Sequence, residues 1–449
     1  MTDHGAQSTQ NAAVESTPSE NSTPLFLSRR RTFFLVICVL AVGWSGYSYW
    51  SIESGLKRGQ QAAAKGHWSR ARNHLSRYLQ WHPDDSAAHL LTAEALVRDN
   101  TRSGQDSVNQ AIEHLMQIKE DSPLAATARL QQARLSLLIL QRPAAAERLL
   151  RESLDLNPDS LDANILMWKL MDVTGRHIVS RQYFWRAYEV SPASGRPPLL
   201  RDWFLAEFFP ETANTSFHNA TGARAVGELP ASISLLVRLR ESEPEAHFVH
   251  AALAAYYLER GQPKSSLELL KESPDLTKAM KDPFFVSVLL ESLVDLGENE
   301  KATICFEQFP EPHSDYLYWR SKAMFHHYVT EDATAAVHAY EEALTKWPAK
   351  FDWGLMTKLS ESLRKVGRSD DAESVQERVK QLTTRILTEE KTSQLRDKLR
   401  GLNDPAVAGE LCDIYTEFGL MKEANAWGDH QQKLLTSSST FLPSSTSAK

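Results

Sequence analysis

One spacing of small and apolar residues recurs along the chain. It consists of a small residue, a large apolar residue four positions on, a small or apolar residue three later, and a proline five later. Offsets of three and four place residues on one face of a helix, and proline ends a helix but is tolerated in the first turn of the next. The pattern therefore predicts repeated helix pairs. Five segments carry it: Ala71-Leu75-Tyr78-Pro83, Ala111-Leu115-Ile118-Pro123, Ala146-Leu150-Ser153-Pro158, Ser180-Phe184-Ala187-Pro192 and Ala336-Tyr340-Ala343-Pro348.

On these residues the chain resembles the tetratricopeptide-repeat (TPR) family, whose units are helix–turn–helix pairs of about 34 residues. Pro123, Pro158 and Pro192 recur at nearly that period, and Gly59 and Gly66 precede the first unit where that family has small residues. The first-helix tryptophan of the family is mostly missing. The resemblance implies an all-α fold, a TPR-like α-solenoid of helix–turn–helix pairs. Its concave groove would hold a peptide, an extended segment or another helix.

The pattern divides the chain into six parts. Four clear repeats are followed by a stretch with too many prolines for uninterrupted helix pairs, and repeat-like pairs then resume. We expect a disordered polar tail (1–28), a transmembrane anchor (29–52), the N-terminal half of the solenoid (53–193), an irregular segment with an aromatic helix and a loop (194–244), the C-terminal half of the solenoid (245–435) and a disordered tail (436–449).

The predicted anchor rests on 21 residues without a charge, from Thr32 to Ile52. A helix of that length spans the hydrocarbon core of a bilayer, which is about 30 Å thick. Three arginines precede it and aromatic residues follow, as at a membrane interface. A cleaved secretory signal is the competing interpretation, but no small-x-small cleavage site follows the apolar run. We therefore expect a single-pass protein.

The orientation of this anchor follows from charge. Arg29, Arg30 and Arg31 abut the N-terminal side, which favours a cytoplasmic N-terminus. Lys57, Arg58 and Lys65 on the other side weaken the count, but large folded domains translocate largely regardless of charge. We expect the repeat domain on the non-cytoplasmic, periplasmic-type side. This organisation is typical of a bacterial envelope protein.

Composition narrows the possible partners and chemistry. The net charge is −7, and a mildly acidic chain lacks the basic face that nucleic-acid phosphates require. We expect no nucleic-acid partner. The cysteines are Cys38 in the predicted anchor, Cys305 and Cys412. The last two are far apart in the sequence, and repeat units contact mainly their neighbours, so we expect no disulfide between them.

Little in the sequence points to catalysis. His247 and His250 are close in sequence but have no third ligand at a recognised metal-site spacing. There is no phosphate-binding loop or dinucleotide fingerprint. We expect no cofactor, no metal and no enzymatic activity; an enzyme with its site in 194–244 is the alternative that we keep. Asn214 and Asn219 begin glycosylation-type triplets in a polar stretch, where such triplets are common by chance.

An aromatic set lies just before that polar stretch. Repeat packing explains it, and a partner-binding patch beside a mobile loop is the alternative. We name it as the candidate partner-binding site: Trp203, Phe204, Phe208 and Phe209.

Together these features predict a membrane-anchored, non-catalytic scaffold whose repeat groove binds partner proteins or peptides. A sharper alternative is an assembly factor for an envelope system, such as haem-protein maturation, secretion or export. A homo-oligomer formed through the groove, or through Ala41, Gly43 and Gly46 of the anchor, is a further expectation.

Overall fold

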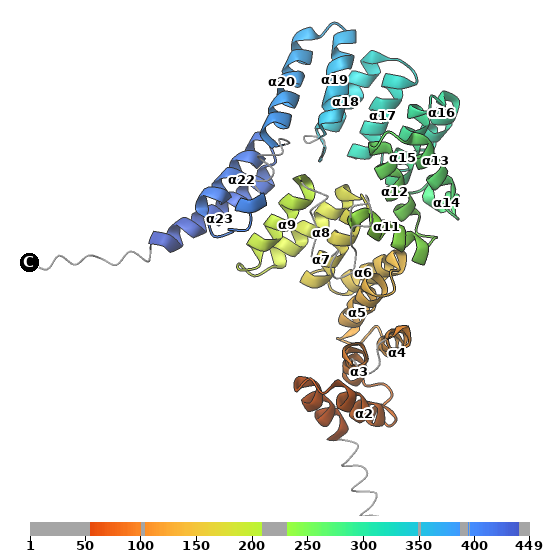
Figure 1. Cartoon of the computed structure of the whole chain (residues 1–449), viewed down its shortest axis with the longest axis vertical. Coiled ribbons are helices and arrows are strands. Elements are labelled where there is room, and N and C mark those ends of the chain that lie inside the picture. The colour runs from red at the N-terminus through yellow and green to blue at the C-terminus, as the bar shows by residue number, and fades with distance from the viewer. Residues whose placement is uncertain are drawn as a thin grey trace, which may run out of the picture. The chain divides into compact units, whose positions relative to one another are not determined.

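The computed structural model describes residues 54–99, 104–208, 231–348, 352–386, 394 and 396–439. The chain divides into two compact units, one ending at Pro83 and the other beginning at Asp84. Every regular element among the described residues is a helix (Figure 1). The all-α class predicted from the sequence is therefore correct.

The first unit contains one helix pair. A helix over residues 54–64 is joined through Gly66, whose φ is +72°, to α2 (Trp68–Leu79). A Cβ atom on Gly59 would lie 2.7 Å from the side chain of Leu75, so the missing side chain lets the two helices approach closely. The small residue and the turn glycine predicted from the repeat pattern have these two roles.

The second unit is a succession of antiparallel helix pairs. Neighbours in sequence pack as α3 with α4, α5 with α6, α7 with α8, α12 with α13, α15 with α16, α17 with α18, α19 with α20, and α22 with α23. The helices are α3 (Ser86–Arg98), α4 (Gln105–Met116), α5 (Ala125–Leu138), α6 (Pro143–Leu156), α7 (Leu161–Val173), α8 (His177–Val190), α9 (Arg196–Phe208), α11 (Ala231–Ser242), α12 (His247–Glu259), α13 (Pro263–Lys271), α14 (Leu276–Ala279), α15 (Pro283–Asp295), α16 (Asn299–Glu307), α17 (Tyr316–Tyr328), α18 (Ala333–Leu344), α19 (Trp353–Lys365), α20 (Ser369–Ile386), α22 (Pro405–Glu417) and α23 (Met421–Ser439).

Local sequence explains where these helices begin and end. The side chains of Asp282, Asp315 and Asp352 accept backbone N–H groups in the first turns of α15, α17 and α19, as N-caps do. Gly297 and Gly367 have φ of +70° and +80° and follow the ends of α15 and α19, where a left-handed residue closes the helix. Each cap or stop lies within a few residues of the helix that it delimits, which explains why the sequence predicts these elements well.

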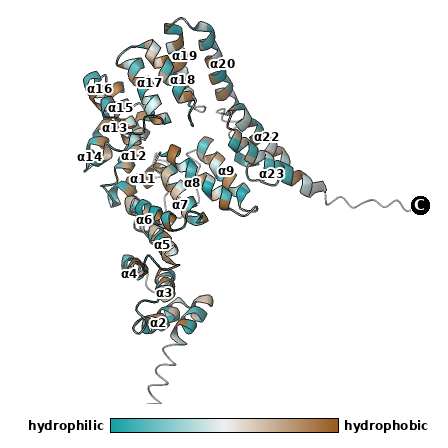
Figure 2. Ribbon diagram, turned by 180° about the vertical axis from the view of Figure 1, so that it is seen from behind, coloured by the Kyte–Doolittle hydropathy of each residue, from teal (hydrophilic) through white to brown (hydrophobic). Residues whose placement is uncertain are grey.

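The small residues of the repeat pattern lie in the core. Ala111, Ala146, Ser180 and Ala336 are completely buried. Hydrophobic and hydrophilic residues are interspersed along the helices (Figure 2), as expected of helices with one buried face. At these positions the small side chains allow the close packing of neighbouring helices that the spacing predicts.

The predicted irregular segment contains two helices. The first is α9, which corresponds to the aromatic helix that the sequence predicts in this segment, and the second is α11, which the sequence does not predict. Residues 209–230 between them lie outside the described part. After this interruption the chain returns to its earlier repeats: Leu235 and Leu239 of α11 share one core cluster with Leu150 of α6 and Met167 of α7.

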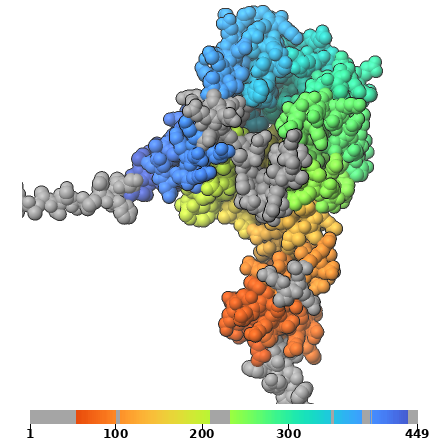
Figure 3. Space-filling model, in the orientation of Figure 1, coloured from red at the N-terminus to blue at the C-terminus, as the bar shows by residue number. Residues whose placement is uncertain are grey.

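The C-terminal helix pair closes the second unit. Residues of α22 and α23 share a core cluster with residues of α7, α8 and α9, and α23 contacts α9 directly (Figures 1 and 3). The last repeats of the chain thus lie against repeats from far earlier in the sequence. Helix α23 extends to Ser439, past the boundary at 436 that the sequence suggests.

The predicted anchor at 29–52 lies outside the described residues, as does the N-terminal tail. Among the helices that the structure describes, none is both long and apolar enough to cross a membrane.

Candidate interaction site

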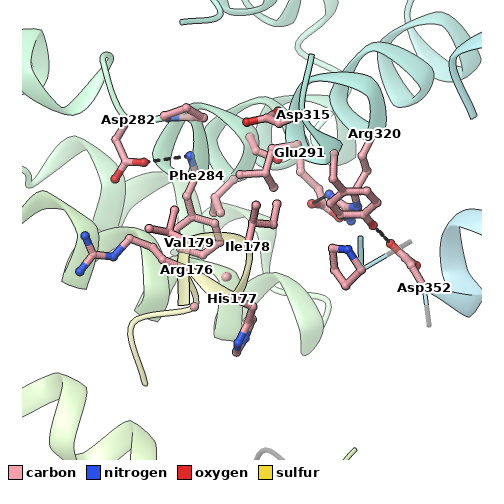
Figure 4. A pocket seen from close by; sticks show the side chains of 18 of the residues that line it. Arg176, His177, Ile178, Val179, Asp282, Phe284, Glu291, Asp315, Arg320 and Asp352 are labelled. Carbon is pink, nitrogen blue, oxygen red and sulfur yellow. Dashed lines mark hydrogen bonds and ion pairs between the residues drawn. The ribbon is translucent and has the colours of Figure 1, made fainter. Parts of the chain in front are cut away.

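A cavity of about 410 Å³ lies within the second unit, where the turn between α7 and α8 meets the later repeats (Figure 4). Its walls come from that turn, from α12, α15 and α17, and from the start of α19. Such a volume is within the range of protein ligand pockets, about 300–1,000 Å³. The cavity is the leading candidate for an interaction site.

The α7–α8 turn fits closely against α15. Gly175 has a φ of +73°, and a Cβ atom there would lie only 2.7 Å from the ring of Phe284. The next residue, Arg176, places its guanidinium 3.9 Å from the centre of the Phe248 ring and donates through Nη1 to Glu147 at 2.7 Å. This pairing directs Arg176 away from the centre of the cavity (Figure 4). The chain's own turn therefore fills part of the groove of the later repeats.

His177 is held at the base of the turn. Its Nδ1 lies 2.8 Å from Oδ1 of Asp172, the carboxylate of which is buried. Burial alone would lower the pKa of His177, but the hydrogen bond to Asp172 and that carboxylate's charge outweigh it, and the pKa is raised. This pair fixes the start of α8 relative to the end of α7.

Much of the cavity wall is apolar. The first turn of α8 contributes Ile178 and Val179, α12 contributes Leu258, and α15 contributes Phe284 and Val288. Val179 is 36% exposed although it is a large aliphatic residue. An uncovered aliphatic side chain beside a cavity provides area that a ligand can bury.

The polar part of the wall is organised around Arg320. Its Nη1 and Nη2 donate to the two carboxylate oxygens of Glu291 at 2.9 and 3.1 Å, and its Nε lies 3.4 Å from Oδ2 of Asp352. The hydroxyl of Tyr316 also donates to Asp352. Burial and the neighbouring Asp352 raise the pKa of Tyr316, so the phenol stays protonated and continues to donate. These bonds join α15, α17 and α19.

Carboxylates outnumber cations in the wall. Five acidic residues line the cavity against two arginines and His177. All three basic residues are already paired, Arg176 with Glu147, Arg320 with Glu291 and His177 with Asp172. Ser287, the serine of the wall, accepts a hydrogen bond of 3.2 Å from Ser321. The polar groups of the wall are thus engaged in helix caps and in bonds between repeats. The cavity is therefore suited to binding a ligand. The five acids are Glu259, Asp282, Glu291, Asp315 and Asp352.

The aromatic set proposed from the sequence lies elsewhere, at the closure between α9 and the C-terminal pair. Trp203 and Phe204 are buried, with 2% and 0% of their surface exposed. The centre of the Trp203 ring lies 4.3 Å from that of Phe184 and 5.8 Å from that of Trp347, and both pairs are stacked. Their burial supports the packing interpretation, and a role in partner binding stays a prediction.

The other two residues of that set differ. Phe208 is half-buried, with its ring 5.8 Å from those of Tyr415 and Phe418. Phe209 lies outside the described residues. Three residues of the set are therefore placed by the structure, all of them in helix α9.

Two polar contacts join α8 and α9 to the C-terminal helix pair, and the sequence alone does not predict either of them. Arg181 of α8 donates through Nε and Nη2 to Oε1 of Glu423 of α23, at 3.1 and 2.7 Å, and the Glu423 side chain is fully buried. Tyr415 of α22 donates to Oε2 of Glu207 of α9 at 2.5 Å. Burial raises the pKa of Glu207 well above its usual range, and the nearby Glu423 carboxylate raises it further. We call these four residues the closure cluster.

The histidines and cysteines singled out in the sequence are placed by the structure in ordinary helix packing. Both ring nitrogens of His250 lie near backbone carbonyls, at 3.2 Å from Leu269 and 2.8 Å from Pro244, and Nε2 of His247 is 3.5 Å from Asp282. Within the described ranges, no group of three or more His, Cys, Asp or Glu residues is placed to hold a metal. Cys305 and Cys412 are both free thiols. Asn214 and Asn219 fall in the part that is not described.

Comparisons with known proteins give only distant likenesses. No family model matches the chain, and no curated protein matches it significantly. Among solved structures, it is similar to the Cut9–Hcn1 hetero-tetramer of APC/C, with 14% identity over 86% of this chain and 76% of that one and a TM-score of 0.35.

Two further structures give lower scores. A tetratricopeptide repeat protein from Parabacteroides merdae is 13% identical over 70% of this chain and 99% of that one, with a TM-score of 0.26. PilF of Pseudomonas aeruginosa is 17% identical over 50% of this chain and 92% of that one, with a TM-score of 0.24. Scores this low do not establish a shared overall fold, so the helical-repeat description rests on the chain's own helix pairing.

Proposed function

We propose that this protein is a non-catalytic scaffold that binds partner proteins or peptides in the cavity between the α7–α8 turn and the later repeats. The observation that carries the proposal is that cavity, because it combines an uncovered aliphatic wall with polar groups already used in helix capping and inter-repeat bonds. Stacked repeats that share such a groove are suited to holding an extended partner. The cavity supports the expectation of protein partners from the sequence, and the aromatic set Trp203, Phe204, Phe208 and Phe209 stays a separate prediction.

The experiment is site-specific photo-crosslinking in the cell that naturally makes the protein. A benzophenone amino acid replaces Val179, at the cavity, or Ile304, which is 56% exposed on α16 and does not line the cavity. We expect discrete protein adducts from position 179 that are absent from position 304. No adduct at 179, or the same adducts at both positions, would refute the proposal.

We further propose that residues 29–52 anchor the scaffold in a membrane, with the N-terminus cytoplasmic and the repeats on the other side. The long uncharged run and the three arginines before it support this arrangement. The full chain should stay in the membrane fraction after extraction at alkaline pH, whereas a chain lacking 29–52 should not. Reporter enzymes fused after residue 439 would test the orientation, because an activity restricted to the cytoplasm would contradict it.

A further inference from the structure

We infer that the cavity binds an extended partner segment in which a lysine or arginine, preceded by an aliphatic residue, recurs at every third position. This inference rests on the proposed function and names the chemistry of the partner. Three features of the cavity specify that partner: its apolar wall, the charge of its lining and the spacing of the repeats that form it.

The aliphatic part of the partner is specified by the uncovered wall. Val179 of α8 and Val288 and Phe284 of α15 line the cavity. The guanidinium of Arg176 lies 3.9 Å from the centre of the Phe248 ring and joins the α7–α8 turn to α12, and a volume of about 410 Å³ remains beside this contact. Aliphatic side chains entering it would bury the exposed part of Val179.

The charged part of the partner is specified by the carboxylates. Oδ1 of Asp282 accepts a hydrogen bond from the backbone N–H of Phe284 at 3.0 Å, and its Oδ2 lies 3.5 Å from Nε2 of His247. Asp315 accepts from Tyr318 N at 2.9 Å, and no side-chain cation is bonded to it among the described residues. Both aspartates lie on the helix side of the cavity, across from the turn, in Figure 4. An anionic partner would be repelled here, and a cationic one attracted.

The spacing of the cations follows from the repeats. Asp282 and Asp315 occupy the same N-cap position of α15 and α17, which pack side by side. Axes of packed helices are about 8–10 Å apart. A partner in the polyproline II conformation advances about 3.1 Å per residue with three residues per turn, so every third side chain lies on the same face. The two carboxylates are therefore matched by cations three residues apart, or about 9 Å, along such a partner.

Capping alone is the competing explanation of these aspartates. Asp332 and Asp404 cap α18 and α22 without lining the cavity, so aspartate at an N-cap needs no ligand to explain it. Asparagine caps about as well as aspartate but carries no charge. The exchange of Asp for Asn therefore separates the two roles.

The experiment measures fluorescence anisotropy of a labelled nonapeptide, Gly-Ser-Leu-Lys-Ser-Leu-Lys-Ser-Gly, with the full chain in detergent. We expect saturable binding that weakens with added salt. D282N/D315N should weaken it about fivefold to tenfold, since two partly exposed ion pairs are lost, and V179W should abolish it by filling the cavity. The control D332N should change neither binding nor thermal stability, and D282N/D315N should also keep its thermal stability.

Three results would overturn the inference. They are no binding of the lysine peptide up to millimolar concentration, equal binding of a peptide with glutamate in place of lysine, and unchanged binding by both D282N/D315N and V179W. A peptide with the same composition but adjacent lysines tests the spacing and should bind more weakly. If crosslinked partners are found at position 179 and the lysine peptide still does not bind, only this inference fails; if neither occurs, the proposed function fails as well.

Discussion

Replacing Glu423 by Gln should loosen the C-terminal helix pair. The Glu423 carboxylate is fully buried and accepts two hydrogen bonds from Arg181, the side chain of which keeps 27% of its surface exposed. Breaking a buried ion pair costs about 3–5 kcal/mol because the remaining charge stays desolvated. Water can reach Arg181, which reduces the penalty, and we expect about 2 kcal/mol. That corresponds to a roughly 30-fold larger opening equilibrium for α22 and α23.

Hydrogen exchange followed by mass spectrometry measures this opening helix by helix. Protection in α22 and α23 should fall about 30-fold in E423Q, while protection in α12 to α17 should stay unchanged, because these helices do not contact Glu423. The matched control is E410Q on α22, which removes a surface ion pair with Lys398, 2.7 Å long, whose Lys and Glu side chains are 46% and 44% exposed. Such pairs are worth about 0–1 kcal/mol.

Two results would refute this reasoning. If E423Q and E410Q lose the same protection, the buried pair does not hold the closure. If E423Q loses protection equally in every helix of the second unit, the closure does not open by itself, and the pair contributes to global stability instead.

Three further predictions follow from the same contacts. Because burial raises the pKa of Glu207, the folded protein holds this proton more tightly than the unfolded chain does. The resulting contribution to stability is present below the ordinary carboxyl pKa and is lost as the pH rises through the pKa of the folded state. Helices α22 and α23 should therefore be better protected from hydrogen exchange at pH 5 than at pH 8, and E207Q should reduce that difference. G175A should lower the free energy of unfolding by about 2–4 kcal/mol in denaturant titrations, because it adds a clash with α15 to the strain of a positive φ. The control G367A has a φ of +80° with open space around it and should cost only about 1–2 kcal/mol. Equal losses would contradict the close contact at Gly175. Burial raises the pKa of Cys305 to about 12, so iodoacetamide at pH 8 should label the partly exposed Cys412 first in the native protein, and faster labelling of Cys305 would contradict its burial.

Much of the fold could be predicted from local patterns. Helix α15 begins at Pro283 after the cap Asp282 and ends before Gly297, so both of its ends carry local sequence signals. Caps, stops and one-sided apolar spacing act over a few residues, so they can be read without knowing the partner helices. Helix α11 escapes prediction because it follows a stretch rich in breakers, in which the proline just before it, Pro230, reads as one more breaker.

The candidate site could not be predicted in the same way. The sequence suggests Trp203 and Phe204 because exposed aromatics often bind partners, but their burial is decided by α22 and α23, which come much later in the chain. Conversely, Val179 looks like an ordinary helix residue, and only the folded chain places it beside a cavity.

By itself, therefore, the sequence determined that this protein is a series of helix pairs with close approaches at small residues, because each of these features depends on neighbouring positions. The tertiary structure decided that the series closes on itself, with Arg181 meeting Glu423 and the α7–α8 turn entering the groove of later repeats. The physical reason is that the curvature of a solenoid is the sum of small rotations at every repeat interface. Which distant residues meet depends on that sum, and no single segment encodes it.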